Sequence, residues 1–585
     1  MQTLNGWLVI GVQVVLVSHA WLSVGQGAGQ GEGRVGPRAV LVVDEAHALP
    51  SALARACACT LPGAALRRTE RCLHQYRRRY RARMAPRGCL HLTRLAYLLR
   101  HLRGMIDKEK NDGDGEESDE AVVYTPQDFA VEAQIDHLNL GETIEFCKST
   151  KLARKLHGFS QRYKLQDLEE EEKETTTNNL TDKKKSFENF LKNICNKKTE
   201  VQTKEEQSVP NHAEQDVLKN RGEEESDMSA GTCLYGVLEF LQMLRSPSDC
   251  GRVVLRRSCS LQYLLLEPAR RFQHIAGRCR SVIVAGGTME PVSEFVELLT
   301  GGVVSGEPSG EPSGEPSGEP SGQPRSECGG VVVVRCGHVV PAHHVVALAL
   351  SSGPAGNTLT LNYQQRQAAD TLRSIGCILR NVCRVVPAGV VCFLPSYECE
   401  RVLYDHMTST GDLRAIRARK AVFREPKSAA DVEQVLSGHA AAASGGGGGS
   451  LLLSVVGGKL SEGLNFSDDL CRCVVVVGLP YPNARSPELR SLMTHLTRSR
   501  GPGAGDRHYN ALCMKQVNQC IGRAVRHALD YACVLLVDSR YSRPRIVGAL
   551  PSFVRNSLIT NCTFGKAIGH IAKFFKEHKA QKSKH

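Results

Sequence analysis

Beyond its first 24 residues, this 585-residue sequence contains no stretch that is long and apolar enough to span a bilayer. The apolar run at 7–24 has no basic residue before it and no clear cleavage pattern, so a secretory signal is the weaker interpretation. The sequence has no match to G-x-x-x-x-G-K-[ST], the loop that cradles phosphates in many nucleotide hydrolases. Its 22 cysteines form no short repeating framework, which favours buried thiols in a reducing compartment.

The length is several times that of a usual domain and predicts at least two separately cored domains. Lys and Arg number 74 against 61 for Asp and Glu, a formal net charge of +13. This excess favours a polyanionic partner such as nucleic acid, although a modest positive charge also serves solubility alone.

Hydrophobic spacing divides the chain into helical and strand-rich parts. Helices are predicted at 66–102, 127–163, 233–245, 261–275 and 364–382. Strands are predicted at 39–43, 281–285, 331–335, 389–394, 451–456, 473–478 and 533–538. Charge-dense stretches at 107–120 and 168–228, four Gly-Glu-Pro-Ser copies at 306–321 and a glycine run at 444–450 are predicted to be irregular. Alternation of strands and helices after residue 331 predicts an α/β fold with a largely parallel sheet.

The strand at 39–43 ends in Asp-Glu-Ala-His, which we call the acidic box (residues 44–47). The carboxyl end of a parallel strand faces the ligand crevice, so Asp44 is suited to hold Mg²⁺ through water. Glu45 would orient or deprotonate an attacking water. Surface carboxylates that merely close a strand are the alternative interpretation.

The segment at 519–527, here the arginine segment, places Gln519, Arg523 and Arg526 at i, i+4 and i+7. On one continuous helix these three would share a face, with Val517 and its apolar neighbours Ile521 and Ala524 packed inward. Paired arginines can stabilise the charge of a transferred phosphate. A solvated basic helix is the alternative.

Five strings in this order give a specific resemblance. They are DEAH at 44–47, AGGTMEPVSEF at 285–295, GVVCFLPSYE at 389–398, VVGGKLSEGLNFSD at 455–468 and QCIGRAVRH at 519–527. They resemble motifs II to VI of the XPD-like, iron–sulfur, DEAH-box superfamily 2 DNA helicases. With FCKSTKLARKLHGFSQRY at 146–163, the wording is most similar to the chromosome-cohesion branch, the DEAD/H-box helicase 11 type. The resemblance extends from about residue 39 onward.

The resemblance implies two RecA-like α/β motor domains, the first incomplete, with a helical arch-like insertion. The parts it implies are an unmatched segment (1–38), motor domain 1 (39–65 and 251–300), the arch-like insertion (66–250), a linker (301–330), motor domain 2 (331–565) and a basic tail (566–585). Single-stranded DNA would thread under the arch.

The resemblance also implies roles for particular residues. Catalysis would fall to Asp44, Glu45, His47, Gln519, Arg523 and Arg526, with Asp44 serving Mg²⁺. Nucleotide contact and coupling would fall to Gly287, Thr288, Gly463 and Asn465, of which Asn465 replaces an Asp of many wider relatives. DNA contact would fall to Ser396, Lys459, Arg77, Arg78, Arg79 and Arg81, the last four lying in an arginine-rich stretch at 67–83.

Two departures accompany this resemblance. The family carries a phosphate loop and four cysteines for a 4Fe–4S cluster before the acidic box, whereas residues 1–43 contain neither. We therefore expect an incomplete or alternatively started chain with no cluster ligands and weak ATP binding of its own. Cys57, Cys59, Cys72 and Cys89 follow the box and are predicted to be structural thiols.

The function implied by the resemblance is a nuclear, ATP-dependent DNA helicase that acts in DNA repair and sister chromatid cohesion. Its cofactors would be ATP and Mg²⁺, and its polarity 5′ to 3′. Its partners would be single-stranded and forked DNA together with cohesion or replication proteins, and not a membrane. The alternative is a catalytically dead remnant that binds DNA or a protein partner.

Overall fold

The computed structural model describes residue 19 and residues 39–107, 121–163, 230–245, 249–256, 259–287, 289–290, 292–300, 325–328, 331–334, 337–428, 430–445, 448–460, 466 and 468–582. The predicted irregular stretches at 107–120, 168–228, 306–321 and 444–450 fall wholly or partly outside them. The chain forms two compact units, one of Met1–Leu53 with Glu267–His585 and one of Ala54–Leu266. No helix among the described residues has the length and apolarity needed to cross a membrane.

The larger unit contains a seven-stranded sheet with the strand order β11-β12-β10-β13-β14-β9-β15. Its strands are β9 (Val345–Leu350), β10 (Gly389–Leu394), β11 (Ala421–Arg424), β12 (Ser450–Val455), β13 (Cys473–Val477), β14 (Ala532–Val537) and β15 (Leu558–Cys562). All neighbours run parallel, and every residue of β10, β12, β13 and β14 is buried. Burial on both faces is typical of parallel sheets and confirms the α/β prediction.

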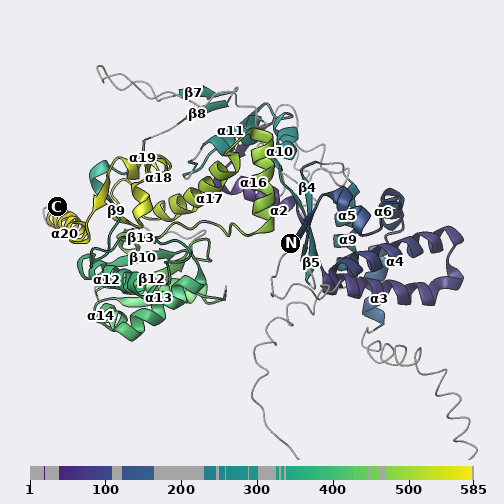
Figure 1. The fold of residues 1–585 in the computed structure, drawn as a ribbon, viewed down its shortest axis with the longest axis horizontal. Helices are drawn as coiled ribbons and strands as arrows, with labels where there is room; N and C mark the ends of the chain where they lie inside the picture. Colours follow the sequence, from purple (N-terminus) through teal and green to yellow (C-terminus); the bar gives the residue numbers. More distant parts are fainter. Residues whose placement is uncertain are drawn as a thin grey trace, which may run out of the picture. The chain divides into compact units, whose positions relative to one another are not determined.

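Helices cover both faces of this sheet and create two apolar cores (Figure 1). One face packs against α12 (Ala369–Val385), α13 (Tyr397–Thr410), α14 (Asp412–Arg417) and α20 (Phe564–Lys582). The other packs against α15 (Val432–Ser444), α17 (Ala504–Ile521), α18 (Pro544–Gly548) and α19 (Ser552–Arg555). The predicted helix at 364–382 corresponds to α12, and its apolar face, including Leu372, Ile375 and Leu379, is buried.

Four of the five strands predicted after residue 331 are confirmed to within a residue at each end. The fifth, at 331–335, does not enter the sheet: β8 (Val331–Val334) pairs antiparallel with β7 (Arg325–Cys328) in a separate hairpin. The sheet instead contains β9, which the prediction missed. Valine content alone does not separate a half-exposed ribbon such as β8 from a strand buried on both faces.

A second, two-stranded sheet in the larger unit carries the acidic box. β1 (Val40–Val43) pairs in parallel with β6 (Ser281–Val284), although 237 intervening positions separate the two strands in sequence. Val43, the adjacent α2 (Leu49–Ala56), α10 (Ala269–Ala276) and α11 (Ser293–Thr300) form its small core. Val40, Val42 and Ile283 remain half exposed on the strands.

The Ala54–Leu266 unit has its own core, built from helices and a four-stranded antiparallel sheet of order β2-β5-β4-β3. The helices are α3 (Gly63–Tyr80), α4 (Pro86–Asp107), α5 (Pro126–Glu132), α6 (Leu140–Ser149), α7 (Leu152–Arg162) and α9 (Ala230–Arg245). The strands are β2 (Cys59–Pro62), β3 (Val122–Tyr124), β4 (Gly251–Arg256) and β5 (Ser260–Leu265). Helices predicted at 66–102, 127–163 and 233–245 are therefore confirmed, with turns between them.

The helix predicted at 261–275 is wrong in its first half. Residues 260–265 form β5, in which Leu261 and Tyr263 are buried and pair with β4. The helix α10 begins only after Pro268, because a proline disfavours helical backbone in the residue before it. The spacing of apolar residues fitted both structures, and pairing with β4 decides between them.

Candidate functional site

The acidic box lies directly after β1, with Asp44 and Glu45 exposed. The backbone N–H of Glu45 donates a 2.8 Å hydrogen bond to Oδ1 of Asp44, and Oε2 of Glu45 lies 3.1 Å from Nδ1 of His47. Glu45 adopts a left-handed conformation with φ of 46°, which costs a non-glycine residue roughly 1 kcal/mol. The box thus presents two carboxylates at the carboxyl end of a parallel strand, an arrangement that suits a hard divalent cation.

The second predicted motif (285–295), which follows β6, holds the acidic box in place through its first residue. The N–H of Ala46 donates to the carbonyl of Ala285 over 2.9 Å, and the N–H of Ala285 donates to the carbonyl of Val43 over 2.9 Å. A Cβ on Gly286 would lie 3.4 Å from the Ala46 nitrogen, so the two segments are in van der Waals contact here. Gly287, exposed, follows this junction. Thr288, predicted to couple hydrolysis to movement, lies outside the described residues.

One prediction about the arginine segment, that its three polar residues share a helical face, is wrong. Helix α17 ends at Ile521, so Arg523 and Arg526 do not share a helical face with Gln519. Gly522 donates to the Asn518 carbonyl over 2.8 Å, and tighter turns follow it, because glycine weakens a helix.

The apolar side of the arginine segment was predicted correctly. Val517, Ile521 and Ala524 are fully buried, Arg526 is exposed and Arg523 is partly exposed. The two arginines therefore lie on an ordered turn that is anchored by apolar residues. They belong to the same compact unit as the acidic box.

A buried ion pair, missed in the sequence, fixes the turn after the arginine segment. Nη1 of Arg472 lies 2.8 Å from Oδ1 of Asp530, and the two side chains are 3% and 0% exposed. Oδ2 of Asp530 accepts the backbone N–H of Arg526 over 3.2 Å. Arg472 also lies 4.1 Å above the ring of Tyr531 and pairs with Asp469 at 3.0 Å. A buried charge without such partners would be costly, so the pair sets the path of residues 526–531.

Residues from three adjacent strands meet at the carboxyl edge of the larger sheet. Ser396 follows β10, Lys459 follows β12, and Glu425 follows β11. The Oγ of Ser396 accepts the N–H of Cys399 over 3.2 Å and caps α13, while Lys459 is exposed and its Nζ donates to the carbonyl of Lys427. The structure thus brings Ser396 and Lys459, predicted DNA contacts, to the same edge. Gly463 and Asn465 lie outside the described residues.

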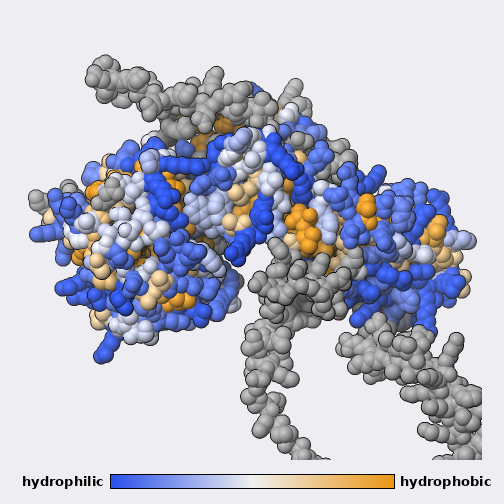
Figure 2. Space-filling view, viewed as in Figure 1, coloured by the Kyte–Doolittle hydropathy of each residue, from blue (hydrophilic) through white to orange (hydrophobic). Residues whose placement is uncertain are grey.

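The predicted arginine contacts lie in the last turn of α3 and directly after it, in the Ala54–Leu266 unit, a region whose visible surface is largely hydrophilic (Figure 2). Arg78, Arg79 and Arg81 are exposed, and Arg77 is partly exposed. The guanidinium of Arg79 lies 4.3 Å above the ring of Tyr163. Aromatic rings of Tyr76, Tyr80, Phe159 and Tyr163 pack together beneath these charges. Exposed cations beside packed aromatic rings form a surface suited to single-stranded nucleic acid.

The cysteines that follow the acidic box are packed as structural thiols. Cys57, Cys59 and Cys72 are buried, and Cys89 is partly buried. Burial raises the pKa of Cys59 to about 12 and that of Cys72 to about 11, so both remain protonated near neutral pH. The Sγ of Cys59 donates to the carbonyl of Gly236 and that of Cys72 to the carbonyl of Leu156. These two thiols are therefore held within the packing of the Ala54–Leu266 unit.

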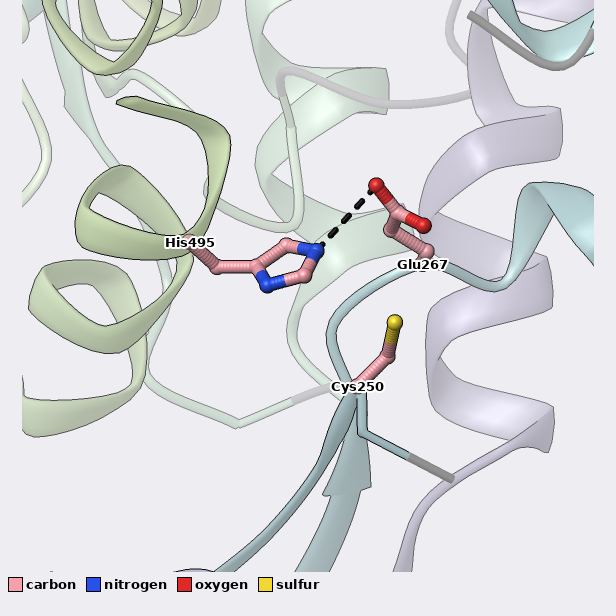
Figure 3. Close-up of side chains that lie close together, drawn as sticks. All are labelled: Cys250, Glu267 and His495. Carbon is pink, nitrogen blue, oxygen red and sulfur yellow. Dashed lines mark ion pairs between the residues drawn. The ribbon is translucent and has the colours of Figure 1, made fainter. Parts of the chain in front are cut away.

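Contacts within the larger unit join residues on either side of β6 to two helices from the C-terminal part of the chain. Nε2 of His495, on α16 (Pro487–Arg500), lies 3.1 Å from Oε1 of Glu267, the ion pair drawn in Figure 3. Nη2 of Arg500 lies 3.9 Å from the same oxygen. Nδ2 of Asn518 donates to the Ala549 carbonyl over 2.9 Å and lies 3.5 Å from the Glu290 carbonyl. These pairs are remote in sequence, and only Glu290 among their residues belongs to a predicted motif, the string at 285–295.

Comparisons with known proteins show similarity to helicases. Residues 379–557 match the family described as Helicase C-terminal domain. The chain is 35% identical over 565 residues to the Danio rerio protein named ATP-dependent DNA helicase DDX11, covering 93% of this chain and 58% of that protein. The Mus musculus protein of the same name is 35% identical over 562 residues, covering 92% and 57%. The chain thus spans less than two thirds of either relative.

Solved structures give a further similarity. The structure titled S. tokodaii Xpd4 covers 89% of this chain and 76% of its own, with 14% sequence identity and a TM-score of 0.44.

Proposed function

We propose that this chain, a homologue of the DNA helicase DDX11 over most of its length, is an ATP-dependent DNA helicase. One observation carries the proposal: the Helicase C-terminal match at 379–557 contains Ser396, Lys459 and the arginine segment in the predicted order. In this proposal, 39–65 and 251–300 belong to a first motor domain. Residues 66–250 form the arch-like insertion, and 331–565 form the second motor domain.

Asp44 and Glu45 are proposed to serve ATP hydrolysis. The exposed carboxylate of Asp44 fits Mg²⁺, held through water, and the bound ion would neutralise phosphate charge. Glu45 orients the attacking water or accepts its proton. Its left-handed backbone and the bond from Ala46 to Ala285 hold the carboxylate at the end of β1. His47, in contact with Glu45, together with Gly287 and Thr288, couples hydrolysis to movement.

The arginine segment is proposed to act on the same nucleotide. Arg526, exposed at the turn anchored by Asp530, and Arg523 stabilise the charge that develops on the transferred phosphate. Gln519, on the last turn of α17, contacts ATP beside them. Gly463 and Asn465 line the cleft between the motor domains.

DNA is proposed to meet two surfaces. Ser396 and Lys459 contact the backbone at the carboxyl edge of the large sheet, and Arg77, Arg78, Arg79 and Arg81 contact phosphates in the arch-like insertion. The preferred partners are single-stranded and forked DNA, with a 5′ to 3′ direction of movement. The cellular setting is the nucleus, in DNA repair and sister chromatid cohesion, with cohesion or replication proteins as partners.

DNA-stimulated ATP hydrolysis tests the proposal directly. The full chain is assayed at saturating ATP with and without single-stranded DNA, beside Glu45→Gln, which keeps the shape of the side chain and removes its basicity. We expect DNA to raise the turnover, and Glu45→Gln to lower it by about 10²–10⁴-fold. Salt-dependent DNA binding without turnover in the unchanged chain would instead favour the non-catalytic DNA-binding remnant.

A further inference from the structure

Glu425 is a buried carboxylate that bonds almost entirely to one loop. The loop, here the glycine–lysine loop (residues 455–460), follows β12, and Glu425 follows the neighbouring strand β11. Glu425 is 7% exposed, and its own N–H continues the sheet by donating to the Leu453 carbonyl over 2.8 Å. Its backbone is therefore fixed by the sheet, and its side chain is directed at the loop.

The carboxylate accepts three hydrogen bonds, one from the residue just before this loop and one from each end of it. Oε2 accepts the Ser454 hydroxyl over 2.8 Å and the Val455 N–H over 3.2 Å, while Oε1 accepts the Leu460 N–H over 2.9 Å. Bonds from backbone amides to an ionised acceptor are stronger than those between neutral groups. A single side chain thus closes residues 455–460 into a defined loop.

Glycine at two positions is required by this closure. A Cβ on Gly458 would lie 2.5 Å from Oε1 of Glu425, so the loop backbone packs directly against the carboxylate. Gly457 adopts a φ of 72°. Between the buried Gly458 and the buried Leu460, Lys459 is the exposed residue. The loop conformation therefore directs Lys459 outward.

The same loop is joined to the strand that carries the other predicted DNA contact. The N–H of Val456 donates to the carbonyl of Leu394, the last residue of β10, over 2.9 Å, and Ser396 lies two residues further on. Tyr397, next to Ser396 and 41% exposed, lies close to the backbone of Lys459. Fixing the loop thus also fixes Lys459 relative to Ser396.

We propose that Glu425 is a positioning residue for DNA binding, which holds the glycine–lysine loop so that Lys459 meets a phosphate of the bound strand. The proposal rests on the proposed function, since it assumes that Lys459 contacts DNA. Glu425 itself, buried behind the loop, touches neither DNA nor nucleotide in this role. At the surface, its negative charge would repel a DNA phosphate. Inside the domain, the carboxylate instead accepts hydrogen bonds from backbone N–H groups.

Binding of a fluorescent single-stranded oligonucleotide by the full chain tests the proposal through its salt dependence. Four variants are compared with the unchanged chain: Lys459→Ala, Glu425→Gln, their double variant, and Glu433→Gln, which makes the same change at an exposed site on α15. Each lost phosphate contact should reduce the slope of log affinity against log salt by about 0.7 for a single strand.

We expect Lys459→Ala and Glu425→Gln to lower the slope equally, the double variant to lower it no further, and Glu433→Gln to leave it unchanged. If Lys459→Ala lowers the slope and Glu425→Gln does not, or if the two losses add, the positioning role is overturned and the DNA contact stands. If Lys459→Ala leaves the slope unchanged, both the contact and the positioning role are overturned. Should Glu425→Gln fail to fold, Ser454→Ala, which removes one of the three bonds, must lower affinity in the same direction.

Discussion

The guanidinium of Arg472 and the carboxylate of Asp530 lie 2.8 Å apart, almost entirely out of contact with solvent. Arg472 precedes β13 and Asp530 precedes β14, so their pair joins two adjacent strands of the large sheet. Asp530 also accepts the N–H of Arg526. A stabilising contact of the fold is therefore directly bonded to the backbone of a residue proposed to act on ATP.

Removing the charge of Asp530 should destabilise the larger unit. Asp530→Asn leaves the Arg472 guanidinium buried without its closest anion, and we expect a loss of about 3–5 kcal/mol in the free energy of unfolding. Asp469→Asn is the matched control, because Asp469 pairs with the same guanidinium but is 50% exposed and should cost about 0–1 kcal/mol. Urea unfolding followed by circular dichroism measures both. Equal losses in the two variants would contradict this account of the pair.

The larger unit should lose stability in mild acid because of His439. Its side chain is 1% exposed, Nε2 lies 3.0 Å from the Leu470 carbonyl, and burial lowers the pKa of the imidazole. The unfolded chain therefore takes up a proton near its ordinary pKa of about 6.5 while the folded chain does not. Stability is unaffected above this pH and falls as pH drops below it, by up to about 1.4 kcal/mol per pH unit.

Unfolding midpoints in urea between about pH 5 and pH 8 measure the effect of His439, a window that spans its ordinary pKa. His439→Gln should flatten the acid side of the profile, and His570→Asn, at an exposed position on α20, should leave it as it is. An unchanged acid slope in His439→Gln would contradict the prediction, because it would show that the pKa of this histidine is the same in the folded and unfolded chains.

The arginines in the last turn of α3 and directly after it should contribute to DNA affinity independently of the large sheet. Changing Arg78 and Arg81 to Ala removes two exposed charges and should reduce the salt slope of single-stranded DNA binding by about 1.4. Arg414→Ala, at an exposed position on α14, serves as the control. A slope that falls as much in the control as in the α3 variant would mean that net charge, and not this surface, attracts the DNA.

The sequence predicted the parts of the fold that depend on local pattern. Continuous apolar runs identified β10, β12, β13 and β14, and helical spacing identified α12, because burial on both faces or one face leaves a clear pattern. It missed β9 and misplaced 331–335, since local composition does not show which apolar run pairs into the sheet. Only pairing with β14 and β15 shows that β9 belongs in the sheet.

The candidate site was predictable where a motif is contiguous and not where distant residues meet. Asp44, Glu45 and the arginine segment are proposed from their motifs and from the order of those motifs along the chain. The end of α17 was missed because the apolar spacing of Val517, Ile521 and Ala524 continues past Gly522 even though the helix does not. Glu425 and Arg472 act through partners on other strands, so no local pattern marks them.

The central claim is that the acidic box and the arginine segment act on one nucleotide. A double-variant comparison of DNA-stimulated ATP turnover in the full chain, with Glu45→Gln, Arg526→Ala and the two combined, tests it most directly. We predict that each single change lowers turnover by about 10²-fold or more, and that the combination is little slower than the slower single variant, because groups that act as a unit are not additive. Turnover that is unaffected by Arg526→Ala, or absent from the unchanged chain at saturating ATP and DNA, would contradict the claim.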